Sequence, residues 1–153
     1  MKTKVLFIPI SILCILAGCS GGISEKNLPQ QMVSSFNAKF TSASKVKWFS
    51  ENDSVYEASF VFNGREHSAL FTKEGQWLET ETPVITAELP LTVVQTLNNG
   101  FYNYRIKSCK QMETPSQGIF YEVLVKNDMG ALEVRLNADG LILGKKEASK
   151  EKD

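Results

Sequence analysis

The side chains that could support covalent or metal chemistry are few in this chain. The 153 residues contain one histidine, His67, and three cysteines, of which only Cys109 lies beyond the N-terminal segment. A nucleophile needs a base within hydrogen-bond reach, and a zinc site needs several Cys or His ligands. One histidine without a cysteine pair supplies neither. We therefore expect no metal, no cofactor and no catalytic residue, with His67 in strand-edge packing and Cys109 as a small buried hydrophobe.

Glutamates remain as candidates for acid–base chemistry. Glu57 and Glu122 occupy equivalent places, because each follows a tyrosine, Tyr56 or Tyr121, in a segment of alternating apolar residues. Alternation places each glutamate on the strand face opposite its tyrosine, and one face of an antiparallel sheet is commonly solvated. A solvated structural position is the simpler interpretation. An enzyme that uses Glu57 or Cys109 stays open as a third hypothesis.

The N-terminus resembles that of an exported lipoprotein. Lys2 and Lys4 precede an apolar run over residues 5–16, which is shorter than the roughly 20 residues of a membrane-spanning helix but fits the core of a signal peptide. Leu16-Ala17-Gly18-Cys19 resembles the lipobox of bacterial lipoproteins, in which the cysteine is lipidated and becomes the first residue. The alternative is an ordinary cleaved signal peptide with a coincidental cysteine.

This resemblance predicts a signal peptide over residues 1–18, lipidation at Cys19 and a flexible Gly- and Ser-containing tether over residues 19–26. It places the protein in the bacterial cell envelope, attached through Cys19 to the outer membrane and facing the periplasm. Removal of Lys2 and Lys4 leaves 15 of 17 basic residues against 17 acidic residues. A weakly acidic chain without a basic stripe is not expected to bind nucleic acid.

The rest of the chain repeats one pattern. Apolar, turn and Leu-Pro positions of the first half recur 61 residues later at first and 65 residues later afterwards, which is typical of a duplicated unit with one lengthened loop. The repeated positions are Leu28-Pro29, Val33, Phe40, Tyr56-Glu57, Glu74-Gly75 and Leu78, matched by Leu89-Pro90, Val94, Phe101, Tyr121-Glu122, Asp139-Gly140 and Leu143.

Each half reads as one amphipathic helix followed by four antiparallel strands. In the first half, apolar residues recur at helical spacing from Met32 to Phe40, and alternating segments follow at residues 45–50, 56–62, 66–72 and 76–81. In the second half, the helix follows Pro90 and the strands lie near 104–112, 119–126, 131–137 and 141–146. We predict an α+β fold of two tandem repeats, 27–82 and 83–146, each a helix on a four-stranded antiparallel sheet, with a charged tail over 147–153.

The strand face turned away from the helices is the candidate binding surface. It combines polar residues with isolated apolar ones, as recognition surfaces do, although an uncovered antiparallel sheet has a similar composition. Trp77 fits either the core or the rim of such a surface. The candidate binding residues are Phe49, Glu57, Ser59, Leu70, Trp77, Glu122, Leu124 and Arg135.

These motifs, taken in order, resemble the PepSY-like proteins, which are also similar to β-lactamase inhibitory protein. The resemblance covers about residues 27–146 and rests on the two Leu-Pro helices, Val46-Lys47-Trp48, residues 56–60, the segment 74–81 and the second Tyr-Glu and Asp-Gly pairs. The second half departs from the pattern, because it lacks a tryptophan at Ser108 and has Gly-Leu-Ile-Leu where the first half has Gly-Gln-Trp-Leu.

The resemblance implies a curved sheet with helices on one face and an open concave face on the other. It also implies an envelope protein without enzymatic activity. Our leading hypothesis is a monomeric, lipid-anchored module that binds an envelope protein or peptide through the open sheet face, with inhibition of that partner as one outcome. The alternative is a carrier that holds a small apolar ligand between the helices and the sheet.

Overall fold

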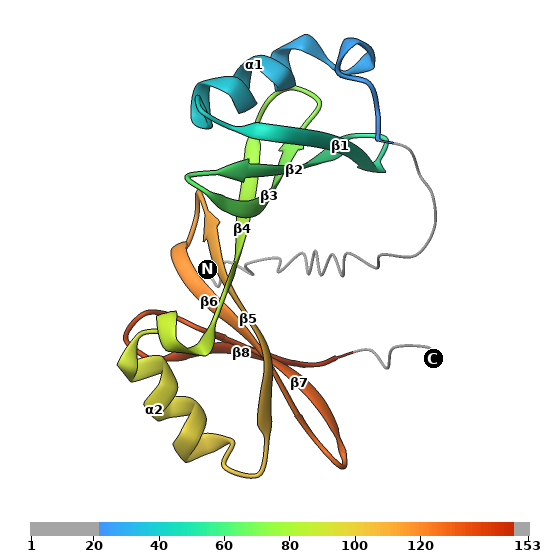
Figure 1. Cartoon of the computed structure of the whole chain (residues 1–153). Helices are drawn as coiled ribbons and strands as arrows, with labels where there is room; N and C mark the ends of the chain where they lie inside the picture. The colour runs from blue at the N-terminus through green and yellow to red at the C-terminus, as the bar shows by residue number, and fades with distance from the viewer. Residues whose placement is uncertain (1–21, 149–153) are drawn as a thin grey trace, which may run out of the picture.

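Two helices and one large antiparallel sheet make up the fold (Figure 1). The structure is a computed structural model of the chain, and it describes residues 22–148. The elements, in chain order, are η1 (Glu25–Asn27), α1 (Gln30–Lys39), β1 (Ser44–Asn52), β2 (Val55–Phe62), β3 (Arg65–Thr72), β4 (Trp77–Val84), η2 (Thr86–Glu88), α2 (Leu91–Gly100), β5 (Arg105–Thr114), β6 (Gly118–Asn127), β7 (Gly130–Leu136) and β8 (Ile142–Glu147).

The strands form a single sheet in the order β1 to β8, so every strand pairs with its neighbours in sequence. We expected each helix to have its own four-stranded sheet, and that expectation is incomplete. β4 runs on to Val84, past the predicted strand over 76–81, and its second part pairs with β5 from Thr80↔Glu113 to Val84↔Cys109. Backbone hydrogen bonds therefore join the two halves, which removes two exposed sheet edges.

Each helix begins directly after a proline and buries one apolar stripe. Pro29 and Pro90 precede α1 and α2, as expected for a residue whose missing N–H would have no helical partner. The stripe of α1 packs against Trp48 and its strand neighbours, and that of α2 packs against Cys109 and its own. The expected helices and their buried faces are both present.

Both helices lie on the same face of the sheet. Ala69, in the core under α1, pairs with Thr80 on β4. Val84 lies four residues further along β4, on the same side of the strand. It pairs with Cys109 and packs against the core under α2. The opposite side of the sheet, which we call the open face, carries neither helix, and the sheet twists strongly between the two halves (Figure 1).

Part of the open face is buried. Four of its side chains have at most 5% of their surface exposed although no helix of residues 22–148 covers them: Glu57, Leu70, Met112 and Phe120. The concave shape that the family resemblance implied stays a prediction.

The two repeated glycines, Gly75 and Gly140, support the helices from below. Both have positive φ, 86° and 82°, where a side chain is strained. A Cβ on Gly140 would lie 2.6 Å from the Thr92 carbonyl oxygen of α2, and one on Gly75 would lie 2.9 Å from the Gln31 carbonyl oxygen of α1. The turn before the last strand of each half therefore touches its helix, and only glycine fits there.

The N-terminal residues that the structure describes are held against the sheet. We expected residues 19–26 to be a flexible tether; the structure instead places residues 22–26 in fixed contacts, and residues 19–21 lie outside the described part. The Ile23 N–H donates to the Trp48 carbonyl oxygen at 2.8 Å, and η1 follows. Within residues 22–148, no helix has the length and apolar character needed to cross a bilayer.

Candidate functional site

The open face contains two equivalent rows of side chains. Strand pairing aligns Phe49, Glu57, Leu70 and Glu79 across β1 to β4, and Lys110, Glu122, Arg135 and Gly144 across β5 to β8. We call these the first row and the second row. Each has a glutamate in second place, as the sequence predicted for Glu57 and Glu122. The residues that flank this glutamate are apolar in the first row and cationic in the second.

The second row is a network of ion pairs. The Arg135 Nε donates to a Glu122 carboxylate oxygen at 2.9 Å, and its Nη2 lies 3.7 Å from Glu133. Lys110 Nζ lies 2.8 Å from a carboxylate oxygen of Glu81 on β4. These groups are partly buried, so water screens their charges less than those of an exposed pair. The network fixes the positions of both cations on the open face.

The first row holds carboxylates with a weaker supply of positive charge. Burial, and then the charges of Glu81 and Glu122, raise the pKa of Glu79 to about 7 against the opposing charges of Arg135 and Lys110. Within residues 22–148, the Glu79 carboxyl group makes no ion pair and no hydrogen bond. A partly buried carboxyl group whose pKa lies near neutral pH on a central strand of the open face is a candidate for a functional group.

Two further carboxyl groups on or beside this face, those of Glu51 and Glu133, also have raised pKa values. The pKa of Glu51 is raised by burial and by its hydrogen bond and charge interaction with Glu57. Burial and the nearby Glu122 raise the pKa of Glu133, against the pull of Arg135 and Lys146. Negative charge is therefore crowded along the middle of the open face.

The apolar part of the open face lies at its centre. Met112 on β5 pairs with Phe120 on β6, and both are buried. The Arg135 guanidinium lies 6.0 Å from the centroid of the Phe120 ring, within the range of a cation–π contact. Together with Leu70, these residues form an apolar floor below the charged groups.

Seven of the eight candidate binding residues predicted from the sequence lie on the open face. Two of them, Glu57 and Leu70, are only 5% and 3% exposed, so neither can itself anchor a partner in this conformation. The other five are Phe49, Ser59, Glu122, Leu124 and Arg135.

Trp77, the eighth candidate, lies on the helix-covered face. Its indole N–H donates to the Thr80 hydroxyl at 3.0 Å, and it packs beside the core under α1. The Lys39 ammonium of α1 lies 3.5 Å from the centroid of the Trp77 ring. A one-residue shift in pairing at β4, between Leu70↔Glu79 and Phe71↔Trp77, separates Trp77 from the other candidates. This irregularity could not be read from simple alternation.

Sequence reasoning missed Glu79, Glu81, Lys110, Met112 and Phe120. Their signal was the alternation itself: Glu79 and Glu81 lie two residues apart on β4, so both face the same side. All five lie in strands that the sequence predicted, over 76–81, 104–112 and 119–126, but alternation does not show which strands become neighbours. The pairing of β4 with β5 brings these residues to the middle of the face.

His67 and Cys109 lie on the helix-covered face, whereas Glu57 and Glu122 lie on the open face. The His67 Nε2–H donates to the Phe62 carbonyl oxygen at 3.1 Å and the Thr82 hydroxyl lies 2.9 Å from Nδ1, so the neutral ring satisfies both contacts. Burial lowers the pKa of His67, and burial raises the pKa of the Cys109 thiol. Among the described residues, no group of three or more His, Cys, Asp and Glu side chains could hold a metal ion.

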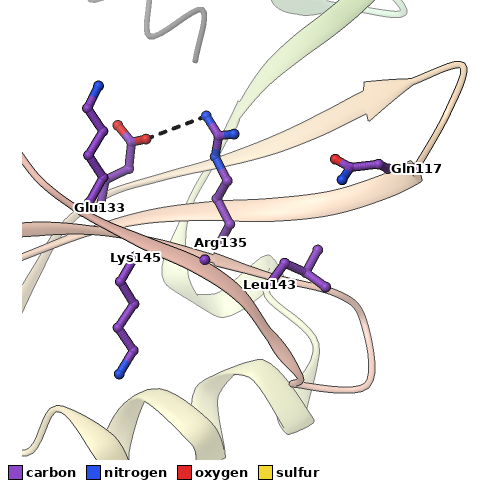
Figure 2. A pocket seen from close by; sticks show the side chains of 7 residues that line it. Gln117, Glu133, Arg135, Leu143 and Lys145 are labelled. Atoms are coloured by element: carbon purple, nitrogen blue, oxygen red, sulfur yellow. Dashed lines mark ion pairs between the residues drawn. The ribbon is translucent and has the colours of Figure 1, made fainter. Parts of the chain in front are cut away.

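A shallow pocket opens at the β8 edge of the sheet. Figure 2 shows Glu133 and Arg135 on one side of this edge, with Lys145 pointing the other way, toward a helix. The side chains that line it are Gln117, Glu133, Arg135, Leu143, Gly144, Lys145 and Lys146. The pocket lies at the end of the second row, outside the space between helices and sheet where the carrier alternative places its ligand.

The comparison with known proteins supports the same fold. A BLIP-like protein from Bacteroides fragilis has 22% sequence identity and a TM-score of 0.75, over 82% of this chain and 90% of that one. A DUF2874 family protein from Bacteroides ovatus has 25% identity and a TM-score of 0.73, over 82% and 92%. A Bacteroides eggerthii protein, provisionally described as periplasmic, has 18% identity and a TM-score of 0.70, over 78% and 88%. No curated protein matches this chain.

The family likeness extends to the sequence. The model of the family described as beta-lactamase-inhibitor-like, PepSY-like matches residues 54–143, which run from the start of β2 to the start of β8 and include both rows except for Phe49 and Gly144. The chain therefore belongs to the PepSY-like family of β-lactamase-inhibitor-like proteins.

Proposed function

We propose that this protein is a non-enzymatic binding module of the cell envelope, which holds a protein or peptide partner against the open face of its sheet. The observation that carries the proposal is Glu79, a partly buried carboxyl group without an ion pair or hydrogen bond in residues 22–148, on a central strand of the open face with its apolar floor. A group of this kind is costly in an isolated domain, and a partner that supplies a donor would offset the cost.

The location and the anchor are part of the proposal. The segment Leu16-Ala17-Gly18-Cys19 supports lipidation at Cys19, which lies outside the described residues, and a relative of the same fold is provisionally described as periplasmic. A lipidated module would be held at the membrane and face the periplasm, with the outer membrane as its site. Descent from two tandem repeats and a monomeric state complete this picture.

Inhibition of the partner is the specific form of binding that the family name favours. The relative from Bacteroides fragilis is a BLIP-like protein, and its 22% identity carries the fold but not the target. A concave face that accepts an exposed loop of another protein would block that loop. The carrier alternative remains the second candidate, and native mass spectrometry of protein from its own envelope tests it through a co-purifying small molecule.

Site-specific crosslinking in living cells tests the binding function. A photo-crosslinking residue replaces Ser59, which is exposed on the open face, and in a matched control replaces Ser34, which is exposed on α1. We expect a discrete adduct from Ser59 and none from Ser34, and we expect Glu79→Gln to change its yield. Equal adducts from both positions, or no adduct from Ser59, would refute binding through the open face.

A further inference from the structure

The folded domain begins unusually close to the residue that is expected to carry lipid. Gly22 and Ile23 lie along the outer edge of β1, where the Ile23 N–H donates to the Trp48 carbonyl oxygen at 2.8 Å. A Cβ on Gly22 would lie 3.3 Å from the same carbonyl oxygen, so the backbone itself rests on the strand. We call residues 22–24 the N-terminal arm.

The arm is tied to the domain along its whole length. The Ile23 side chain packs against the core under α1, and the chain then turns through η1 to the buried Leu28. Ile23 and Leu28 thus contact the domain on both sides of η1, whose own residues are exposed. Local hydrogen bonds from Asn27 N–H to the Ser24 carbonyl oxygen and from Leu28 N–H to the Glu25 carbonyl oxygen shape the turn between them.

The distance from the arm to Cys19 is short. Two residues, Ser20 and Gly21, lie between Cys19 and Gly22, which makes three steps along the chain, and each step spans at most about 3.6 Å. Gly22 can therefore lie no further than about 11 Å from a lipidated Cys19. Eight strands spaced by about 4.8 Å place β1 and β8 roughly 34 Å apart along the sheet. The connection between Cys19 and Gly22, which we call the leash, is therefore much shorter than the sheet is wide.

We propose that the β1 edge and the N-terminal arm rest against the headgroups of the membrane that holds Cys19, so that the sheet stands with β1 at the bilayer and its second half away from it. This inference rests on the lipid anchor in the proposed function. β1 is the first strand of the sheet, and α2 with β5 to β8 lies at the opposite end of the molecule (Figure 1). A short leash at one edge leaves the other edge free to face the periplasm.

The distribution of exposed apolar side chains fits this orientation. Among residues 22–148, every large apolar side chain with high exposure lies in the second half, beyond the β4 strand: Ile85, Leu91, Tyr102, Ile119, Met129, Leu141 and Leu143. Contiguous patches of such side chains mark sites of contact with proteins or membranes. The half nearer the membrane has none, and its edge strand meets the arm at the Ile23↔Trp48 bridge. A partner would reach the open face and the distal half from the periplasmic side.

Distance measurements on the lipidated protein in vesicles test the orientation. In a Cys109→Ala background, a nitroxide label is attached at Ser50→Cys beside the arm or at Met129→Cys in the distal β6–β7 turn; both positions are exposed. The vesicles contain phosphatidylethanolamine, phosphatidylglycerol and a nickel-chelating lipid, and the readout is relaxation of the nitroxide by nickel at the headgroups. We expect the enhancement at Ser50 to exceed that at Met129 several-fold.

Two variants show whether the leash causes the difference. Insertion of eight Gly and Ser residues between Ser20 and Gly21, or Ile23→Pro, which removes the donor to Trp48, should bring the two labels toward equal enhancement. Three results would overturn the orientation: equal relaxation enhancement at the two labels in the protein with the unmodified leash, a larger enhancement at Met129, or a difference between the labels that persists in both variants.

The same samples separate this inference from the proposed function. The mass of the mature protein shows whether Cys19 carries lipid. A chain without lipid would remove both the anchor and the orientation. A lipidated chain with equal labels would overturn the orientation alone, and the crosslinking at Ser59 would still decide whether the open face binds a partner.

Discussion

Removing the charge of Glu79 should stabilise the protein at alkaline pH and leave it nearly unchanged at acid pH. In the folded chain the pKa of Glu79 is raised from 4.5 to about 7, chiefly by burial and then by the carboxylates of Glu81 and Glu122, against Arg135 and Lys110. Between these two pH values the folded state binds more protons than the unfolded state. The free energy of unfolding therefore falls as pH rises.

The magnitude follows from the width of this interval. At about 1.4 kcal/mol for each pH unit, a rise from 4.5 to about 7 corresponds to an upper bound of about 3 kcal/mol. Glu79 is partly exposed, and solvent screening reduces the value; we expect about 2 kcal/mol. This stability is fully present below pH 4.5 and is lost as pH rises through 7. Glu133 and Glu51 also have raised pKa values, so they add to the same trend.

Urea unfolding followed by tryptophan fluorescence measures the effect in the mature chain with Cys19→Ser. We expect Glu79→Gln to exceed the unmodified protein by about 2 kcal/mol at pH 8 and to match it closely at pH 4. The control is Glu66→Gln, which changes an exposed glutamate on the open face of β3. A difference for Glu79→Gln that is absent at pH 8, or equal at both pH values, would refute the environment that we assign to this group.

Three further changes test the packing. A side chain in the left-handed backbone conformation costs about 1–2 kcal/mol, and Gly64→Ala should show this cost alone because a Cβ on Gly64 meets nothing. Gly140→Ala should destabilise the fold well beyond that cost because its Cβ would meet the α2 backbone at 2.6 Å. Thermal unfolding compares the two variants. The Cys109 thiol, whose pKa is raised by burial, should react slowly with iodoacetamide at pH 7.5 and quickly in urea, and fast native reaction would revive the enzyme hypothesis. Lys39→Met should cost about 0.5–1 kcal/mol by removing the ammonium over Trp77, and equal stability would argue against that contact.

The elements of the fold were largely predictable because local signals agree with the final structure. Helical spacing after Pro29 and Pro90, alternation in the strands and Gly at the turns each reflect a short-range constraint. The pairing of β4 with β5 was not predictable, because it joins segments that share no local signal. That pairing places β4 in the middle of the sheet rather than at the edge of the first half, and it brings Lys110 and Met112 of β5 beside Glu81.

The sequence-based alignment of the two halves is wrong by one residue in one strand, where β1 corresponds to β5. We matched Trp48 with Ser108, whereas Trp48 pairs with Ala58 and Cys109 pairs with Val123. Ala58 and Val123 are 65 positions apart, the offset of the later repeat positions, so Cys109 is the counterpart of Trp48. A strand shifted by one residue turns its side chains to the other face. The correct match explains why Cys109 is buried and why Lys110 occupies the place in the second row that Phe49 occupies in the first row.

This match also indicates where the halves have acquired different roles. In the second row, Lys110 and Arg135 surround Glu122, and the charges are satisfied within the chain. The equivalent places in the first row are Phe49 and Leu70, which cannot neutralise a carboxylate, so the surplus of negative charge collects toward Glu79. A purely structural sheet face would gain stability from a cation there. The first row retains an apolar and acidic surface instead, which is the composition that a partner with a basic or hydrogen-bond-donating segment would complete.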